Sequence, residues 1–276
     1  MTVSILGCGW LGLSLAKSLI RKGHSIKGST TSRKKIPQLK EYNIKPFLVK
    51  LTPELEKKEE VQDFWQADVL VLNIPPGRGR ENVIDYHSTQ IQAVIEEISD
   101  SPIHFVIFVS STSVYPSTPG LVKEKDARPG NAVRESGNAL IKAEQLLLDS
   151  DDFETTVVRF GGLYGGDRHP VRYMAGRKNL GKASAPVNLI HRDDCISIIS
   201  KILEKEVTGE IFNAVCDEHP SRKEYYTAAA KSLGLEPPTF RPNESGATYK
   251  VVSNKKLKEQ LPYTFIYPEP LLPEPQ

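Results

Sequence analysis

The chain has 276 residues, 39% hydrophobic and 25% charged, which is enough to bury a sizeable core in one main domain with a small appendage. Its formal net charge of +2 is too small to indicate a nucleic-acid partner. The three cysteines and six histidines show neither C-x-x-C nor metal-ligand spacing, which excludes a disulfide framework and a zinc site.

Cysteine usage and the start of the chain indicate the same compartment. Scattered cysteines, odd in number, fit a reducing cytosol. The chain opens directly into an apolar strand, without a charged-then-apolar leader. No apolar stretch approaches the ~18 residues that a membrane helix needs. We therefore expect a cytoplasmic protein with no membrane partner and no metal.

Strand-like and helix-like segments alternate over the first two thirds of the chain, which is typical of a parallel sheet wrapped by helices. The predicted strands are Val3–Leu6, His24–Lys27, Pro46–Val49, Val69–Asn73, Phe105–Ser110, Thr155–Arg159, Val187–Ile190 and Glu210–Asn213. The predicted helices are Leu11–Lys22, Ser32–Tyr42, Glu81–Ile98, Ala132–Leu148, Asp193–Glu206, Arg222–Leu233 and Asn254–Gln260. This pattern predicts an α/β protein with a doubly wound parallel sheet, the Rossmann fold, whose ligand lies at the carboxyl ends of the strands.

The first strand runs into the turn Gly-Cys-Gly-Trp-Leu-Gly at the start of a helix, which is the dinucleotide fingerprint in its required context. Gly7 permits the tight turn, Gly9 lets the backbone approach a pyrophosphate, and Gly12 lets helix and strand pack closely. The amides of Trp10 and Leu11, at the helix start, are expected to face the anion. A glycine-rich turn without a ligand is the alternative.

The end of the second predicted strand favours NADP over NAD. An NAD site usually carries an acidic residue about 20 residues after the glycines, whereas this chain has none before Glu41. The residues found there are Ser29, Thr30, Thr31, Ser32 and Arg33. Hydroxyls and a guanidinium suit a 2′-phosphate, which a carboxylate would repel. In the alternative interpretation, Ser32 caps the next helix and the basic residues form its solvated first turn.

The ends of the fourth and fifth strands complete the predicted cofactor site. Asn73, Ile74 and Pro75 should pass beside the adenosine, with contact through Asn73 or through apolar stacking. Ser110 closes the fifth strand and is included in the site. We expect residues 1–165 to form an NAD(P)-binding Rossmann domain. Residues 166–276 should add the last strands and a small mixed C-terminal cap, with a proline-dense end at 267–275 that forms neither helix nor central strand.

Five further segments, in this order and spacing, resemble the extended short-chain dehydrogenase/reductase superfamily of NAD(P)-dependent epimerases and dehydratases. They are Val109–Tyr115, Val158–Gly165, Asn188–Asp194, Gly209–Asn213 and Val252–Leu257. The opening glycine turn differs from the usual G-x-x-G-x-x-G of that superfamily. It resembles an atypical branch, the bacterial YeeZ-like proteins.

In the superfamily, a Ser or Thr after the fifth strand and a Tyr-x-x-x-Lys on the next helix carry the chemistry. The resemblance implies that Ser111 supplies the hydroxyl, with Thr112 as a second candidate. The same alignment places Ser136 at the Tyr position and Leu140 at the Lys position. Lys142 does not restore the pair, because Asn138 stands four residues before it. A serine hydroxyl titrates far above a phenol, so the standard proton transfer is in doubt.

A substitute proton donor has to come from elsewhere around the nicotinamide. Tyr164 is a nearby phenol by topology, although packing is the more frequent role of such a side chain. His169 follows Arg168 in a loop that should face the substrate, where the guanidinium suits a carboxylate or a phosphate. A solvated pair of Asp167 and Arg168 is the alternative interpretation of that loop.

The sequence therefore predicts an NADP(H)-dependent oxidoreductase or an epimerase/dehydratase-like enzyme acting on a small polar metabolite. The alternative is a non-catalytic NADP(H)-sensing regulatory protein that has lost the proton relay. An S-adenosylmethionine-dependent methyltransferase is disfavoured, because it also needs an acid for its ribose. A homodimer through the predicted helices at 81–98 and 132–148 would be usual for the superfamily. The substrate itself carries no motif.

Overall fold

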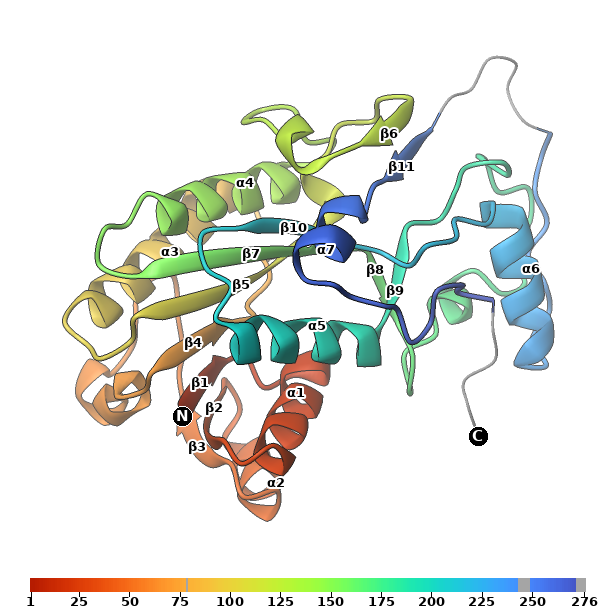
Figure 1. Cartoon of the computed structure of the whole chain (residues 1–276). Coiled ribbons are helices and arrows are strands. Elements are labelled where there is room, and N and C mark those ends of the chain that lie inside the picture. Colours follow the sequence, from red (N-terminus) through yellow and green to blue (C-terminus); the bar gives the residue numbers. More distant parts are fainter. Residues whose placement is uncertain (78, 243–248, 272–276) are drawn as a thin grey trace.

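The structure is a computed structural model, and it describes residues 1–77, 79–242 and 249–271. Its centre is a sheet of seven parallel strands in the order β10-β7-β5-β4-β1-β2-β3 (Figure 1). These strands are β1 (Thr2–Leu6), β2 (Ser25–Thr30), β3 (Lys45–Leu48), β4 (Val69–Leu72), β5 (Phe105–Ser111), β7 (Glu154–Phe160) and β10 (Ile211–Ala214). The predicted doubly wound parallel sheet is confirmed.

The strand order reverses between β1 and β4, and a ligand of such a sheet binds at this point, beyond the carboxyl ends of the strands. The two strands are aligned so that Leu6 lies opposite Leu72. All four residues of β4 are buried, as expected for a strand covered by helices on both faces. The chain segments that follow Leu6 and Leu72 therefore leave the sheet side by side.

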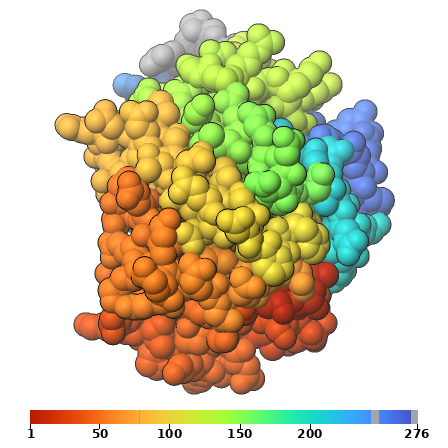
Figure 2. Space-filling view, turned by 90° about the vertical axis from the view of Figure 1, so that its left-hand side faces the viewer, coloured from red at the N-terminus to blue at the C-terminus, as the bar shows by residue number. Residues whose placement is uncertain are grey.

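Helices cover both faces of the sheet (Figure 1). One face packs against α1 (Trp10–Arg21), α2 (Ile36–Glu41), α5 (Arg192–Lys205) and α7 (Lys255–Gln260). The other face packs against α3 (Val83–Ser99) and α4 (Glu135–Leu148). Figure 2 shows α3, in yellow, beside α4, in green, on the molecular surface. These are the two helices for which the sequence suggested a homodimer, which stays a prediction.

The helix predicted over 32–42 is broken in the structure. Residues Arg33–Lys35 form one 3-10 turn, and α2 begins only at Ile36. Pro37 stands in the first turn of α2, where its missing amide proton costs no helical hydrogen bond. Further 3-10 turns are η2 (Lys58–Glu60), η3 (Gln62–Trp65), η4 (Thr112–Val114), η5 (Glu124–Asp126) and η6 (Pro170–Tyr173).

Two small parallel sheets lie outside the central one. β8 (Gly162–Tyr164) pairs with β9 (Leu189–His191), and β6 (Gly120–Val122) pairs with β11 (Lys250–Val252). The strand predicted at 187–190 corresponds to β9 and lies outside the central sheet. Its partner β8 begins at Gly162, just after β7 ends, so the chain leaves the central sheet at Gly161. A Cβ at Gly161 would lie 2.7 Å from the Asn188 carbonyl oxygen. Together with α6 (Arg222–Ser232), the β8–β9 pair forms the region on the right of Figure 1.

Among the described residues, no helix is long and apolar enough to cross a membrane. The same residues contain no cluster of His, Cys, Asp and Glu arranged to hold a metal ion. Residues 267–271 form neither helix nor strand, and the rest of the proline-dense end lies outside the described residues.

Candidate functional site

The three fingerprint glycines meet three different surroundings. Gly7 has a φ of +107°, and a Cβ there would lie 2.3 Å from the Asn73 carbonyl oxygen. A Cβ at Gly12 would lie 2.2 Å from the Gly7 carbonyl oxygen, which is closer than real Cβ contacts. A Cβ at Gly9, by contrast, would meet no atom within 4 Å. The fold thus leaves no room for a side chain at Gly7 or Gly12, whereas Gly9 faces open space.

The turn is held by two residues that the sequence assigned to the cofactor. The Gly7 amide donates to Ser29 Oγ at 2.8 Å, and the Cys8 amide donates to the Ser29 carbonyl oxygen at 2.9 Å. Asn73 Nδ2 donates to the Gly7 carbonyl oxygen at 3.0 Å. Ser29 and Asn73 therefore fix the glycine turn between β2 and β4.

Helix α1 begins at Trp10, directly after this turn. Its N-terminus has no side-chain cap and no acidic residue in the first turn. The Leu11 side chain is buried in the core, which leaves its backbone as the part available to a ligand. The positive end of the helix dipole is therefore not neutralised by the helix itself.

The hydroxyl and basic residues after β2 divide into two groups. Thr30 is buried and its hydroxyl accepts a hydrogen bond from the Ser32 amide at 3.2 Å. Thr31 and Arg33 are exposed, and Ser32 is half-buried. Ser32 makes no side-chain capping bond to the 3-10 turn that follows. Ser29 contacts the glycine turn directly, and residues 31–33 follow it in the chain, directly after β2.

The segment after β4 runs along the other side of the turn. Ile74 is half-buried, with its Cγ2 3.6 Å from where a Cβ of Gly7 would lie. Pro75 is exposed. The structure thus brings the predicted residues of β1, β2 and β4 together at one edge of the sheet.

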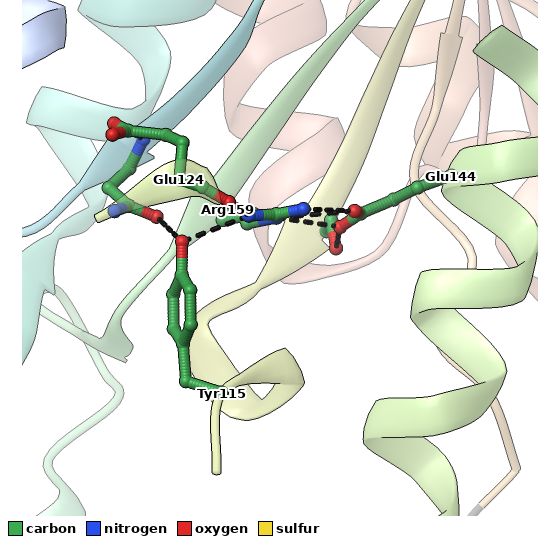
Figure 3. A network of polar contacts seen from close by, with 6 residues as sticks. Tyr115, Glu124, Glu144 and Arg159 are labelled. Atoms are coloured by element: carbon green, nitrogen blue, oxygen red, sulfur yellow. Dashed lines mark hydrogen bonds and ion pairs between the residues drawn. The ribbon is translucent and has the colours of Figure 1, made fainter. Parts of the chain in front are cut away.

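Ser110 belongs to a buried polar network at the carboxyl ends of β5, β7 and β10. It donates to Glu144 Oε1 at 2.5 Å, and Arg159 Nη2 forms an ion pair with Glu144 Oε2 at 2.6 Å. Arg159 Nη1 also donates to the Tyr115 hydroxyl at 2.9 Å, which itself donates to Asn213 Oδ1 at 2.6 Å. Figure 3 shows Arg159 between Tyr115 and Glu144.

This network is closed to proton exchange with a substrate. Tyr115 and Asn213 are fully buried, and Ser110 is nearly so. Burial raises the pKa of Tyr115 to about 12, although the neighbouring Arg159 opposes the rise. The network joins α4 to three strands and supports the sheet edge from inside.

The candidate hydroxyls follow directly on β5. Ser111 is half-buried, and its Oγ accepts a hydrogen bond from the Ser113 amide at 3.2 Å, which leaves its O–H to donate elsewhere. Thr112 is half-buried and opens η4. Lys250 Nζ donates to the carbonyl oxygens of Tyr115 at 2.9 Å and Thr112 at 3.4 Å, and burial lowers its pKa. No sequence signal placed Lys250 here.

Helix α4 offers neither of the usual catalytic side chains. Leu140 is 5% exposed and packs in the core, and Ser136 is half-buried. Lys142 is exposed on a different side of the helix. A Cβ at Gly137 would lie 2.4 Å from the Ser113 carbonyl oxygen, so the helix start packs directly on the turn after Ser111. At the positions of the usual tyrosine and lysine, the helix thus carries a half-buried serine and a core leucine.

The two other candidates for proton transfer differ in exposure. Tyr164 is 7% exposed, and its hydroxyl has no hydrogen-bond partner in the part of the chain that the structure describes. Burial raises the pKa of Tyr164, whose ring packs edge-on against His191 at 5.0 Å between centroids. His169 is half-buried at the start of η6. This burial favours a packing role for Tyr164.

The loop that carries His169 folds onto the start of α1. The Trp10 indole Nε1 donates to Asp167 Oδ1 at 2.7 Å. The guanidinium groups of Arg168 and Arg192 lie over the Trp10 ring, 5.1 and 5.4 Å from its centroid. We call Trp10, Asp167, Arg168 and Arg192 the Trp10 cluster. Arg192 was missed from the sequence, because nothing local links the start of α5 to that of α1.

Comparisons with known proteins identify the fold and the family of the chain. Residues 2–96 match a family profile described as NADP oxidoreductase coenzyme F420-dependent. The UDP-Glc/GlcNAc 4-epimerase of the human pathogen Campylobacter jejuni has a TM-score of 0.80 at 19% identity, covering 98% of this chain and 95% of that chain. The UDP-glucuronic acid 4-epimerase of Bacillus cereus in complex with NAD has a TM-score of 0.78 at 18% identity, covering 96% and 94%. At these identities the two structures establish the fold.

A relative with higher sequence identity establishes the family of the chain as well as its fold. Protein YeeZ of Escherichia coli (strain K12) is 33% identical over 271 residues, which cover 98% of this chain and 97% of YeeZ. The match spans the glycine turn, the candidate hydroxyls and the Trp10 cluster alike. The chain belongs to the YeeZ family, an atypical branch with the fold of the NAD-dependent epimerases and dehydratases.

Proposed function

We propose that the chain binds NADP(H) and is an oxidoreductase or epimerase/dehydratase-like enzyme acting on a small polar metabolite. The observation that carries the proposal is the open space at Gly9, beside an α1 N-terminus that has no acid in its first turn and no side-chain cap. Backbone amides and the helix dipole there suit a diphosphate. The fold match to an epimerase solved with NAD supports the same ligand class.

The preference for the phosphorylated cofactor rests on the residues after β2. Thr31 and Arg33 are exposed directly after β2, the strand whose Ser29 contacts the glycine turn, and the sequence contains no acidic residue before Glu41. We expect Arg33→Ala to weaken NADPH binding about tenfold, with little effect on NADH, because only NADPH carries the 2′-phosphate. Isothermal calorimetry with both ligands measures this, and Lys40→Ala, at an exposed residue of α2, is the matched control. An equal loss for both cofactors would remove the 2′-phosphate assignment.

The proposed chemistry combines a hydride from the nicotinamide with a proton from this chain. Ser111 and Thr112 would hydrogen-bond the reacting oxygen of the substrate, since both are half-buried at the carboxyl end of β5. His169 is the proposed proton donor, because its imidazole is half-buried and open to a ligand, unlike the buried phenols of Tyr164 and Tyr115. This scheme uses no tyrosine–lysine pair.

A non-catalytic sensor is the second candidate, and the buried Leu140 favours it. A leucine packed in the core cannot bind the nicotinamide ribose or lower the pKa of a proton donor. The two candidates differ in NADPH oxidation across a panel of small carbonyl substrates. An enzyme oxidises NADPH with at least one substrate, and Ser111→Ala reduces kcat about a hundredfold. Cofactor binding without turnover on any substrate would favour the sensor.

A further inference from the structure

The Trp10 cluster brings two guanidinium groups to the first residue of α1. Arg168 lies over the indole and forms no ion pair with any described residue. Arg192 has a buried Nε that lacks a hydrogen-bond partner within the described residues. Arg192 forms a long ion pair with Asp193, whose Oδ1 lies 3.6 Å from Nε. Asp167 bonds the indole instead of either guanidinium. Among the described residues, Arg168 thus has no carboxylate partner and Arg192 has one long ion pair.

Their position adds to this imbalance. The N-terminal end of a helix carries about half a positive charge, and cations beside it are unfavourable. Helix α1 has no acidic residue in its first turn to offset the dipole. Two guanidiniums and one helix N-terminus thus meet at Trp10, where the Asp167 carboxylate offsets part of the positive charge. An anion bound between them would relieve the repulsion and provide acceptors for the arginine donors.

The backbone around the cluster is built to hold the arginines there. Gly166 has a φ of +57°, and a Cβ on it would lie 2.5 Å from Arg192 Nη1. The Gly165 amide donates to the Arg168 carbonyl oxygen at 3.0 Å, and the Arg168 amide donates back to Gly165 at 3.1 Å. This tight turn sets the backbone position of Arg168, whose guanidinium lies over the indole. Arg192 comes from the first turn of α5, on a separate element.

We propose that Arg168 and Arg192 are ligands of the dinucleotide's diphosphate, closing over it from the side opposite to the glycine turn. This proposal rests on the proposed function, since it assigns further ligands to the same cofactor. It also makes the Asp167–Trp10 hydrogen bond a connection between the cofactor turn and the loop that carries His169. Cofactor binding would then position the proposed proton donor.

The test separates the diphosphate from the 2′-phosphate. NADPH and NADH share the diphosphate, so Arg168→Gln and Arg192→Gln should each weaken both cofactors by the same factor, about tenfold. Arg21→Gln, at an exposed residue near the C-terminal end of α1, is the matched control and should change neither affinity. Arg192→Lys keeps the charge without the planar fork and should recover part of the loss. Thermal melting without cofactor checks that each variant folds.

Two results would overturn this proposal while leaving the proposed function intact. One is affinity in both glutamine variants equal to that of Arg21→Gln. The other is a loss confined to NADPH, which would make the arginines ligands of the 2′-phosphate. Failure of the unchanged protein to bind either dinucleotide would instead reject the proposed function itself.

Discussion

At the scale of single residues, the structure gives Gly12 a role in folding and leaves Gly9 free for a role in cofactor binding. A Cβ at Gly12 overlaps the Gly7 carbonyl oxygen at 2.2 Å, whereas a Cβ at Gly9 meets open space. We expect Gly12→Ala to lower the free energy of unfolding by about 1–3 kcal/mol, as overpacking does. Gly9→Ala should change it by less than about 0.5 kcal/mol while weakening NADPH binding, because the methyl group occupies the space of the diphosphate. Urea unfolding and calorimetry on the two variants measure both effects.

The opposite ranking would contradict these roles. If Gly9→Ala unfolded the protein and Gly12→Ala did not, the glycine turn would not have the geometry described above. If Gly9→Ala bound NADPH with unchanged affinity, the open space would not be the diphosphate position.

His87 provides a pH-dependent test of the core. It is fully buried on α3, its Nδ1 is 3.1 Å from Gln90 Oε1, and burial lowers its pKa. The pKa of a histidine in an unfolded chain is about 6.5. Below that pH the unfolded chain therefore binds a proton at this position, whereas folded His87 stays neutral to a lower pH. Stability should therefore fall as the pH drops from about 7 towards 5, by at most about 1.4 kcal/mol per pH unit from this group.

The variant His87→Gln removes the titrating ring. Urea unfolding at several pH values should show a shallower fall in stability for this variant than for the unchanged protein. His104→Gln, at an exposed histidine, is the control and should keep the original slope. An unchanged slope in His87→Gln would mean that other groups carry the pH dependence.

At the scale of elements, Asp194 fastens the C-terminal segment to the first turn of α5. Its buried carboxylate accepts hydrogen bonds from the Tyr263 hydroxyl at 2.7 Å, the Ile266 amide at 2.8 Å and the Tyr267 amide at 3.0 Å. Burial raises the pKa of Asp194, and these three donors oppose the rise. The segment itself contributes buried aromatic rings to the core next to α5.

Removing this acceptor should detach the segment. Asp194→Ala removes the shared acceptor of these three donors, which we expect to cost about 1–3 kcal/mol of unfolding free energy. Hydrogen exchange at Ile266 and Tyr267 should accelerate more than exchange in β4. Asp151→Ala, at an exposed aspartate, is the control. Unchanged exchange at both amides would show that Asp194 does not hold the segment.

The order of strands and helices could be predicted from local patterns, because each buried strand of a parallel sheet is an uninterrupted apolar run such as β4. Local sequence patterns gave wrong boundaries or the wrong sheet where contacts with other elements determine the structure. The helix predicted over 32–42 splits because Pro37 sets a new first turn. The strand predicted at 187–190 pairs outside the central sheet, since its partner β8 has only three residues and no strong signal of its own.

At the scale of the whole molecule, the candidate site joins segments that are distant in sequence. The glycine turn could be predicted, because Gly7, Gly9 and Gly12 lie within one strand–turn–helix unit. The Trp10–Asp167 hydrogen bond connects residues that are 157 positions apart in the sequence. The hydrogen bond from Lys250 to the Thr112 carbonyl oxygen connects residues that are 138 positions apart. Such pairs depend on the folded arrangement of the sheet edge, and no periodicity or local motif marks them.

The central claim, that this arrangement is an NADP(H) site, is tested most directly by ligand-dependent thermal stability. A ligand that binds only the folded state stabilises it by about 2.7 kcal/mol at a hundred times its Kd. We predict that NADPH raises Tm more than NADH does, while S-adenosylmethionine leaves it unchanged. No rise in Tm with saturating NADPH, or a rise with S-adenosylmethionine alone, would contradict the assignment.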